Sequence, residues 1–137
     1  GVAARGSGSM RPFGELEAAI MRDLWERAEP ATVRDVLASL STSRKLAYTT
    51  VMTVMDNLHR KGQVTREMSG RAWLYRPVRT QAQHAAALLQ DVLAESADRQ
   101  EVLMHFVADL DSDSVTQLRS AVESARRRGQ QAEGGGP

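Results

Sequence analysis

The sequence has 137 residues, a net charge of +1 and no cysteine. The absence of cysteine excludes disulfides, thiolate chemistry and cysteine-based zinc or iron–sulfur centres. No apolar run approaches the roughly 18–20 residues that a membrane span needs, and no signal peptide follows Met10. We therefore expect a cytoplasmic protein without direct membrane insertion.

Composition divides the chain into four segments. Residues 1–10 are small and rich in Ser and Gly, which is typical of an expression-tag remnant ending at the native start. Residues 11–79 and 80–128 carry the periodic patterns of folded structure, and we interpret them as two domains. Residues 129–137 have the Gly, Gln and Pro content of a disordered tail.

The first domain is predicted to contain three helices followed by a hairpin. Leu16, Ile20 and Leu24 recur at helical spacing, and Thr32 begins a helix-start pattern. Gly62 is suited to end the third helix, and Gly70 lies in a tight turn between two strand-like runs. The expected elements are helices over 15–27, 32–40 and 48–61 and strands over 63–68 and 72–77.

The third helix has an unusual polar face. Its apolar stripe is narrow, and the opposite face carries hydroxyl, amide and guanidinium groups rather than the Lys/Glu mixture of a solvated helix. Such short side chains reach base edges in the major groove of DNA, and threonine methyl groups pack on thymine. The alternative is a neutral helix surface, but threonine is a mediocre helix former and three within five residues need a reason. The predicted base contacts are Thr49, Thr50, Thr53 and Asn57.

Basic residues concentrate around this helix and the hairpin. Residues 44–79 carry eight basic and two acidic side chains, a net charge of +6, whereas residues 80–128 carry −3. An ordinary surface with uneven charge is the alternative to a phosphate-binding block, because charge patterning alone is a weak guide. Positive groups and helix N-termini suit phosphate oxygens. The predicted phosphate contacts are Thr32, Lys45, Tyr48, Arg60, Lys61 and Arg71.

The C-terminal segment is predicted to form three amphipathic helices, over about 80–97, 99–110 and 112–128. They have no second layer to bury their apolar stripes, so we expect a second copy of the chain to complete their core. The predicted dimerisation residues are Val102, Leu103, Phe106, Val107, Val115, Leu118 and Val122.

Several stretches resemble the penicillinase repressor family, the winged-helix repressors of β-lactamase and methicillin-resistance genes. The similarity lies in the run Tyr48-Thr49-Thr50-Val51-Met52-Thr53, the Lys61-Gly62 turn and the run Gly70-Arg71-Ala72-Trp73-Leu74-Tyr75-Arg76-Pro77. It extends over most of residues 13–128. The resemblance implies a homodimer, joined by its C-terminal helices, that binds a two-fold operator on double-stranded DNA.

The resemblance also implies that a membrane-bound sensor protease relieves repression by cleaving the dimerisation helices. The cut in such repressors falls in a run that matches Leu103 to Val107, with Asn commonly before the Phe. The candidate cleavage site here is therefore His105-Phe106, and His105 departs from the family pattern.

We therefore predict a mainly α protein with a small β-hairpin: a winged helix-turn-helix followed by a C-terminal helical dimerisation domain. We expect no enzyme, no metal site and no cofactor, because the sequence shows no set of residues typical of a catalytic site. The histidines, His59, His84 and His105, are not spaced as metal ligands usually are. Two alternatives remain open at this point. One is a winged-helix regulator that responds to a small ligand, and the other is a winged-helix protein-interaction module without a DNA role.

Overall fold

The structure is a computed structural model that describes residues 13–134. The chain forms two compact units that divide between Val92 and Leu93, inside helix α4 (Gln81–Glu95). The first unit thus contains the beginning of α4 in addition to the domain expected over 11–79. The expected tag remnant at residues 1–10, and residues 135–137 of the expected tail, lie outside the described part of the chain.

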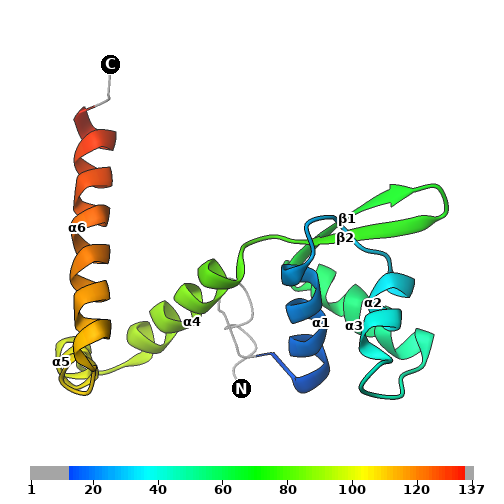
Figure 1. Ribbon diagram of the computed structural model, residues 1–137, viewed down its shortest axis with the longest axis horizontal. Coiled ribbons are helices and arrows are strands. Elements are labelled where there is room, and N and C mark those ends of the chain that lie inside the picture. The colour runs from blue at the N-terminus through cyan, green and yellow to red at the C-terminus, as the bar shows by residue number, and fades with distance from the viewer. Residues whose placement is uncertain (1–12, 135–137) are drawn as a thin grey trace. The chain divides into compact units, whose positions relative to one another are not determined.

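Three helices and an antiparallel hairpin make up most of the first unit, as Figure 1 shows. This order confirms the predicted winged helix-turn-helix, with element ends that differ from the expected ones by at most one residue. The elements are α1 (Glu15–Glu26), α2 (Val33–Leu40), α3 (Tyr48–Arg60), β1 (Val64–Ser69) and β2 (Ala72–Pro77).

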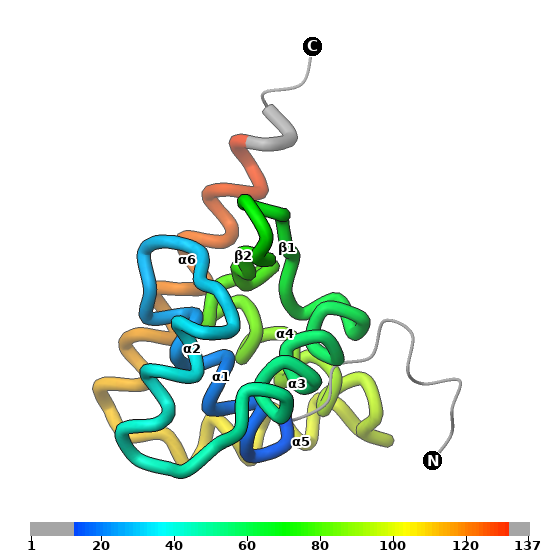
Figure 2. The backbone as a smooth tube through the Cα atoms, turned by 90° about the vertical axis from the view of Figure 1, so that its right-hand side faces the viewer, coloured from blue at the N-terminus to red at the C-terminus, as the bar shows by residue number. Residues whose placement is uncertain are grey.

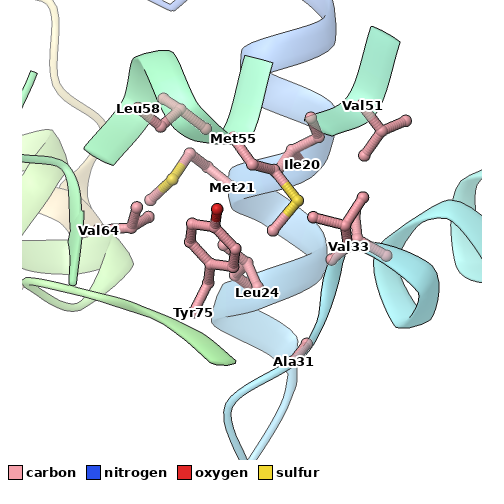
Figure 3. Close-up of a cluster of buried hydrophobic side chains, with 11 residues drawn as sticks. Ile20, Met21, Leu24, Ala31, Val33, Val51, Met55, Leu58, Val64 and Tyr75 are labelled. Atoms are coloured by element: carbon pink, nitrogen blue, oxygen red, sulfur yellow. The ribbon is translucent and has the colours of Figure 1, made fainter. Parts of the chain in front are cut away.

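A single apolar cluster joins these elements (Figure 3). Tyr75 of β2 points into it among side chains from α1 and α3, and only 2% of its surface is exposed. Burial of a side chain of this size stabilises the fold by roughly 1.5–3 kcal/mol. The cluster comprises Ile20, Met21, Leu24, Ala31, Val33, Val36, Val51, Met55, Leu58, Val64 and Tyr75.

The loop between α1 and α2 is joined to the hairpin by an isolated β-bridge. Ala31 and Tyr75 exchange two backbone hydrogen bonds, of 3.0 and 2.8 Å, in an antiparallel bridge. Pro30 favours extended backbone in the residue before it and cannot continue α1. The bridge attaches the base of the hairpin to the helices, so that only its outer half projects (Figure 1).

Two glycines with positive φ determine how the hairpin follows α3. Gly62, at φ 77°, reverses the chain directly after the helix, and the amide of Gln63 donates to the carbonyl of Leu58 at 2.9 Å. Gly70, at φ 64°, is the first residue of a two-residue turn whose flanking pair is Ser69 and Ala72. Glycine at this position is typical of a type II′ hairpin turn.

The beginning of α4 packs against α1 within the first unit. The hydroxyl of Thr80 accepts from the amide of Gln83, and the side chain of Gln83 accepts in return from the amide of Thr80. The indole Nε1 of Trp25 donates to the carbonyl of Arg79 at 2.9 Å. His84, which is 6% exposed, stacks on Phe13 with ring centroids 4.5 Å apart.

The second unit contains α5 (Arg99–Ala108) and α6 (Ser112–Gly134) after the end of α4. The prediction that the last helix ends at Arg128 is wrong, because α6 continues to Gly134 and residues 129–134 are helical rather than a disordered tail. Gln130, Gln131 and Ala132 are good helix formers, and they outweigh the single internal Gly129. No residue of α5 is buried, nor is any residue of α6 whose exposure the structure describes.

Candidate nucleic-acid interface

The polar face of α3 is open to solvent in the first unit. Val51, Met55 and Leu58 point into the core and are fully buried. Because successive helical residues are rotated by about 100°, Thr49 and Thr53 lie opposite these three. Thr50 and Asn57 lie together on one flank of the same face. All three threonines are exposed, whereas Asn57 is half-buried.

The second half of this face is a hydrogen-bonded group rather than a set of free side chains. Arg60 donates from Nη2 to Asp56 Oδ2 at 2.9 Å and to Asn57 Oδ1 at 2.8 Å. Asp56 also accepts from Nη1 of Arg66, on β1, at 3.1 Å. Hydrogen bonds from Arg60, and then from Arg66, hold the pKa of the Asp56 carboxyl below its usual range. With its oxygen engaged, Asn57 presents its amide NH₂ group as the available donor.

Lys61 at the end of α3 has an internal partner on α1. Its Nζ lies 2.6 Å from Oε2 of Glu17. Partial burial raises the pKa of Glu17, but the hydrogen bond from Lys61, the amide of Gly14 and the charge of Lys61 together outweigh it. The pKa of Glu17 is therefore below its ordinary value, and the carboxylate neutralises much of the charge that Lys61 was predicted to offer to phosphate.

Three predicted phosphate ligands lie near the N-termini of α2 and α3. The hydroxyl of Thr32 accepts from the amide of Asp35, and the Asp35 carboxylate accepts from the amide of Thr32. This reciprocal cap places a negative group where a phosphate would lie. Tyr48 is 41% exposed, with the guanidinium of Arg34 at 5.7 Å from its ring centroid. Lys45 is exposed in the loop before α3.

Arg71 is exposed at the tip of the hairpin, next to Gly70. The tip also carries Met68 and Trp73, which face each other across the strands and are both exposed. The ring of Trp73 is covered by the guanidinium of Arg66, which lies 4.4 Å from the centroid.

The predicted dimerisation residues lie on α5 and α6 of the second unit. Val115 is half-buried in the single chain. The candidate cleavage pair lies inside α5, where Nε2 of His105 is 3.1 Å from Oε1 of Glu101 and Phe106 is 51% exposed. The apolar surface is thus present and uncovered. Its exposed members are Val102, Leu103, Phe106, Val107, Leu118 and Val122.

Four residues at the surface formed by α3 and the hairpin were not predicted from the sequence. Arg34 and Met52 are exposed beside the threonine face, and Met52 falls between two threonines that were predicted to contact bases. Glu17 and Arg66 pair with residues far along the chain, across 44 and 10 positions. A local pattern could have found Met52 from its helical position, but no sequence spacing indicates the two long-range ion pairs.

Neither a metal site nor a membrane span is found in the described part of the chain. Residues 13–134 contain no group of three or more His, Cys, Asp or Glu side chains that could hold a metal ion. In the same range no helix is both long enough and apolar enough to cross a membrane.

Three helices, of which the third has a polar outer face, and a hairpin with a basic tip together define the winged helix-turn-helix class. The sequence profile of the penicillinase repressor family matches residues 13–124. Transcriptional regulator BlaI of Mycobacterium tuberculosis, from strains CDC 1551 / Oshkosh and ATCC 25618 / H37Rv, is 45% identical over 113 residues. The alignment covers 80% of this chain and 82% of that protein. The chain belongs to the penicillinase repressor family, whose members are transcriptional repressors rather than enzymes.

Solved structures also resemble the chain. The DNA-binding domain of the repressor BlaI is 20% identical with a TM-score of 0.48, over 54% of this chain and 89% of that one. A point mutant of Staphylococcus aureus MepR, bound to an oligodeoxyribonucleotide, is 14% identical with a TM-score of 0.47, over 85% of this chain and 79% of that one. Membership of the family follows from the sequence match and not from these scores.

Proposed function

We propose that this protein represses transcription as a homodimer that places one α3 helix in each of two major grooves of a two-fold operator. The observation that carries the proposal is the exposed threonine face of α3 together with the exposed basic tip of the hairpin. Figure 2 traces the backbone of α3 and of the two strands that follow it. A helix with short hydroxyl side chains fits the major groove, and the hairpin reaches the neighbouring backbone. Two half-sites would be separated by one or more helical turns of DNA.

Individual side chains take different parts in this proposal. Base edges are contacted by Thr49, Thr50 and Thr53, with the amide nitrogen of Asn57 as a further donor. Thr32 is left out of the phosphate contacts, because Asp35 already occupies the N-terminus of α2 with a carboxylate. Lys61 must exchange Glu17 for a phosphate, which makes its contribution smaller than that of a free lysine. Phosphates are contacted by Lys45, Tyr48, Arg60, Lys61 and Arg71.

The homodimer is supported by the uncovered apolar side chains of α5 and α6. Phe106 and Leu103 on α5 are about half exposed, at 51% and 45%, and Leu118 and Val122 lie on α6. Exposed apolar side chains on two successive helices are unfavourable in water, and their burial against a second copy favours self-association. Because each DNA-binding unit contributes few contacts, joining two of them strengthens operator binding without new contacts.

Relief of repression would follow from separating the two DNA-binding units. The family resemblance implies control by a membrane-bound sensor protease, and the candidate cut lies between His105 and Phe106. These residues are in the middle of a helix, and proteases cleave exposed backbone that can become extended. Cleavage therefore requires α5 to unfold locally, and the regulated genes, β-lactamase genes or others, would then be expressed.

Fluorescence anisotropy with the promoter of the protein's own gene and with scrambled DNA, over a range of salt, tests the DNA-binding part. We expect a large preference for the promoter and a steep salt dependence. Thr50→Ala should weaken the free energy of binding to the operator by roughly 1–3 kcal/mol and change binding to scrambled DNA little. Thr116→Ala is the matched control, because that hydroxyl is bonded to the carbonyl of Ser112 in α6. Equal, weak binding to both DNAs would contradict the proposal.

Sedimentation of the Phe106→Asp variant tests the homodimer. A carboxylate in the middle of an apolar interface is desolvated without a partner, so we expect monomers that bind the operator weakly. Asp109→Asn, an exposed position at the end of α5, is the control for a change of charge beside the same helix. A Phe106→Asp variant that sediments as a dimer would contradict this placement of the interface.

A further inference from the structure

Asp56 connects the polar face of α3 to the hairpin. One of its carboxylate oxygens accepts from Arg60 on the same helix at 2.9 Å, and the other accepts from Arg66 on β1 at 3.1 Å. The first pair is local, four residues apart along α3. The second joins two different elements and ties the middle of the hairpin to α3.

Arg66 makes three contacts at once with its planar guanidinium. Its Nη1 donates to Asp56 and lies 3.4 Å from the hydroxyl of Tyr75, while its face covers the ring of Trp73 at 4.4 Å. The side chain is 22% exposed. Only a fork of donors on a flat cation can use its edge for a carboxylate and its face for an aromatic ring, so lysine is not equivalent here.

The position of Arg66 along the hairpin gives these contacts their importance. A two-stranded hairpin is marginal by itself, and here the bridge from Ala31 to Tyr75 holds it no further out than Arg66, which pairs with Tyr75 across the strands. Beyond Arg66, the residues of β1 are exposed up to the tip. Arg66 is therefore the outermost half-buried residue of β1, and its bond to Asp56 attaches this part of the strand to α3.

We propose that Asp56 and Arg66 are positioning residues for DNA binding, which fix the direction of the hairpin relative to α3. With this direction fixed, Arg71 and the threonine face meet the same DNA site without an ordering cost on binding. The inference rests on the proposed DNA-binding function and assigns to Asp56 a role that its negative charge would not suggest. An acidic group on this surface repels phosphate, so a purely electrostatic view predicts that its removal strengthens binding.

A double-mutant cycle separates positioning from simple charge. Asp56→Asn keeps the shape of the side chain and removes its charge, and Arg71→Ala removes the contact that the hairpin delivers. We expect Asp56→Asn to weaken operator binding about fivefold when Arg71 is present, and less than about twofold in the Arg71→Ala background. Asp56→Asn also releases Arg60, but this changes operator affinity equally with and without Arg71, so it cancels from the coupling free energy of the cycle.

Two further variants sharpen the comparison. Arg66→Lys preserves the charge but loses the fork, and it should reproduce the weakening caused by Asp56→Asn. Glu67→Gln removes the same charge from the next residue of β1, on the opposite face of the hairpin and exposed, and should show no coupling to Arg71. Equal effects of Asp56→Asn in both backgrounds, or wild-type affinity of Arg66→Lys, would overturn the proposal.

Amide hydrogen exchange of the DNA-free protein tests the positioning role of Asp56 and Arg66 independently of DNA. Asp56→Asn should raise the exchange of amides over residues 66–74 by several-fold and leave those of α1 unchanged, because only the outer hairpin is released. Unchanged exchange in the hairpin overturns the positioning role. Wild-type protein that shows no operator preference overturns the proposed function instead, so the two failures are distinguishable.

Discussion

Replacement of His84 by phenylalanine should remove a pH dependence from the stability of the first unit. His84 is 6% exposed, stacks on Phe13 and lies 5.3 Å from the ring centroid of Trp25. Within the described residues its Nδ1 has no hydrogen-bond partner. Burial, and secondarily the positive charge of Arg79, lowers the pKa of His84 below its ordinary value. The folded protein therefore favours the neutral ring.

The sign and size of the effect follow from proton linkage. In the unfolded state a histidine takes up a proton as the pH falls through about 6.5, whereas in the folded protein His84 is protonated only at a lower pH. Between these two pH values the unfolded state binds more protons, so a fall in pH stabilises it relative to the folded state. The slope cannot exceed about 1.4 kcal/mol per pH unit for one group. Between pH 7 and pH 5 the free energy of unfolding should fall by at most about 2 kcal/mol, and the decrease stops once the folded-state histidine is itself protonated.

Urea denaturation at pH 7 and pH 5, followed by tryptophan fluorescence, measures this loss. His84→Phe keeps an aromatic ring against Phe13 but cannot be protonated, so its free energy of unfolding should change less over the same interval. His59 and His105 are present in both proteins and cancel in the comparison. The reasoning is refuted if the two proteins lose the same free energy between the two pH values.

Three other substitutions test the fold and the charge arrangement. Gly62→Ala should lower the free energy of unfolding, measured by urea denaturation, by about 1–2 kcal/mol, because φ at this position is +77°. No atom lies within 4 Å of the added Cβ, so the loss comes from the backbone conformation alone, and an unchanged free energy of unfolding would contradict the positive φ. Leu58→Ala, at a fully buried site, should cost about 2–5 kcal/mol in the same assay, and a loss below this range would mean that the cavity collapses. Glu17→Gln frees Lys61 and should tighten binding to scrambled DNA while costing under about 1 kcal/mol of stability; unchanged anisotropy titrations would mean that Lys61 does not meet phosphate.

The elements of the first unit were predictable because their signals are local. The spacing of Leu16, Ile20 and Leu24, the cap at Thr32 and the glycines at 62 and 70 each act within a few residues, and the structure confirms the resulting helices and hairpin. The end of the last helix was not predictable in the same way. The cluster Arg126-Arg127-Arg128 suits a helix C-terminus, but α6 continues because nothing after it breaks the helix before Gly134.

The candidate interface was predictable only in part, for the same physical reason. Exposure of the threonine face follows from the helical period, since the apolar residues between the threonines must face inward. The partners of Lys61, Asp56 and Arg66 depend on how α1, α3 and β1 pack, and no spacing in the sequence records that packing. Net charge over a segment therefore overstated how many cations are available, because part of it is neutralised from other elements.

The lack of any buried side chain in α5 has a thermodynamic consequence. A ten-residue helix in water lies below the length at which isolated helices persist, so in the proposed homodimer α5 would gain its order from the copy that covers its apolar side chains. Its folding and its association then become one equilibrium, whose position depends on protein concentration. Dilution would melt α5 as it dissociates the complex, and the heat capacity change measured on association would include the ordering of the helix as well as the burial of its surface.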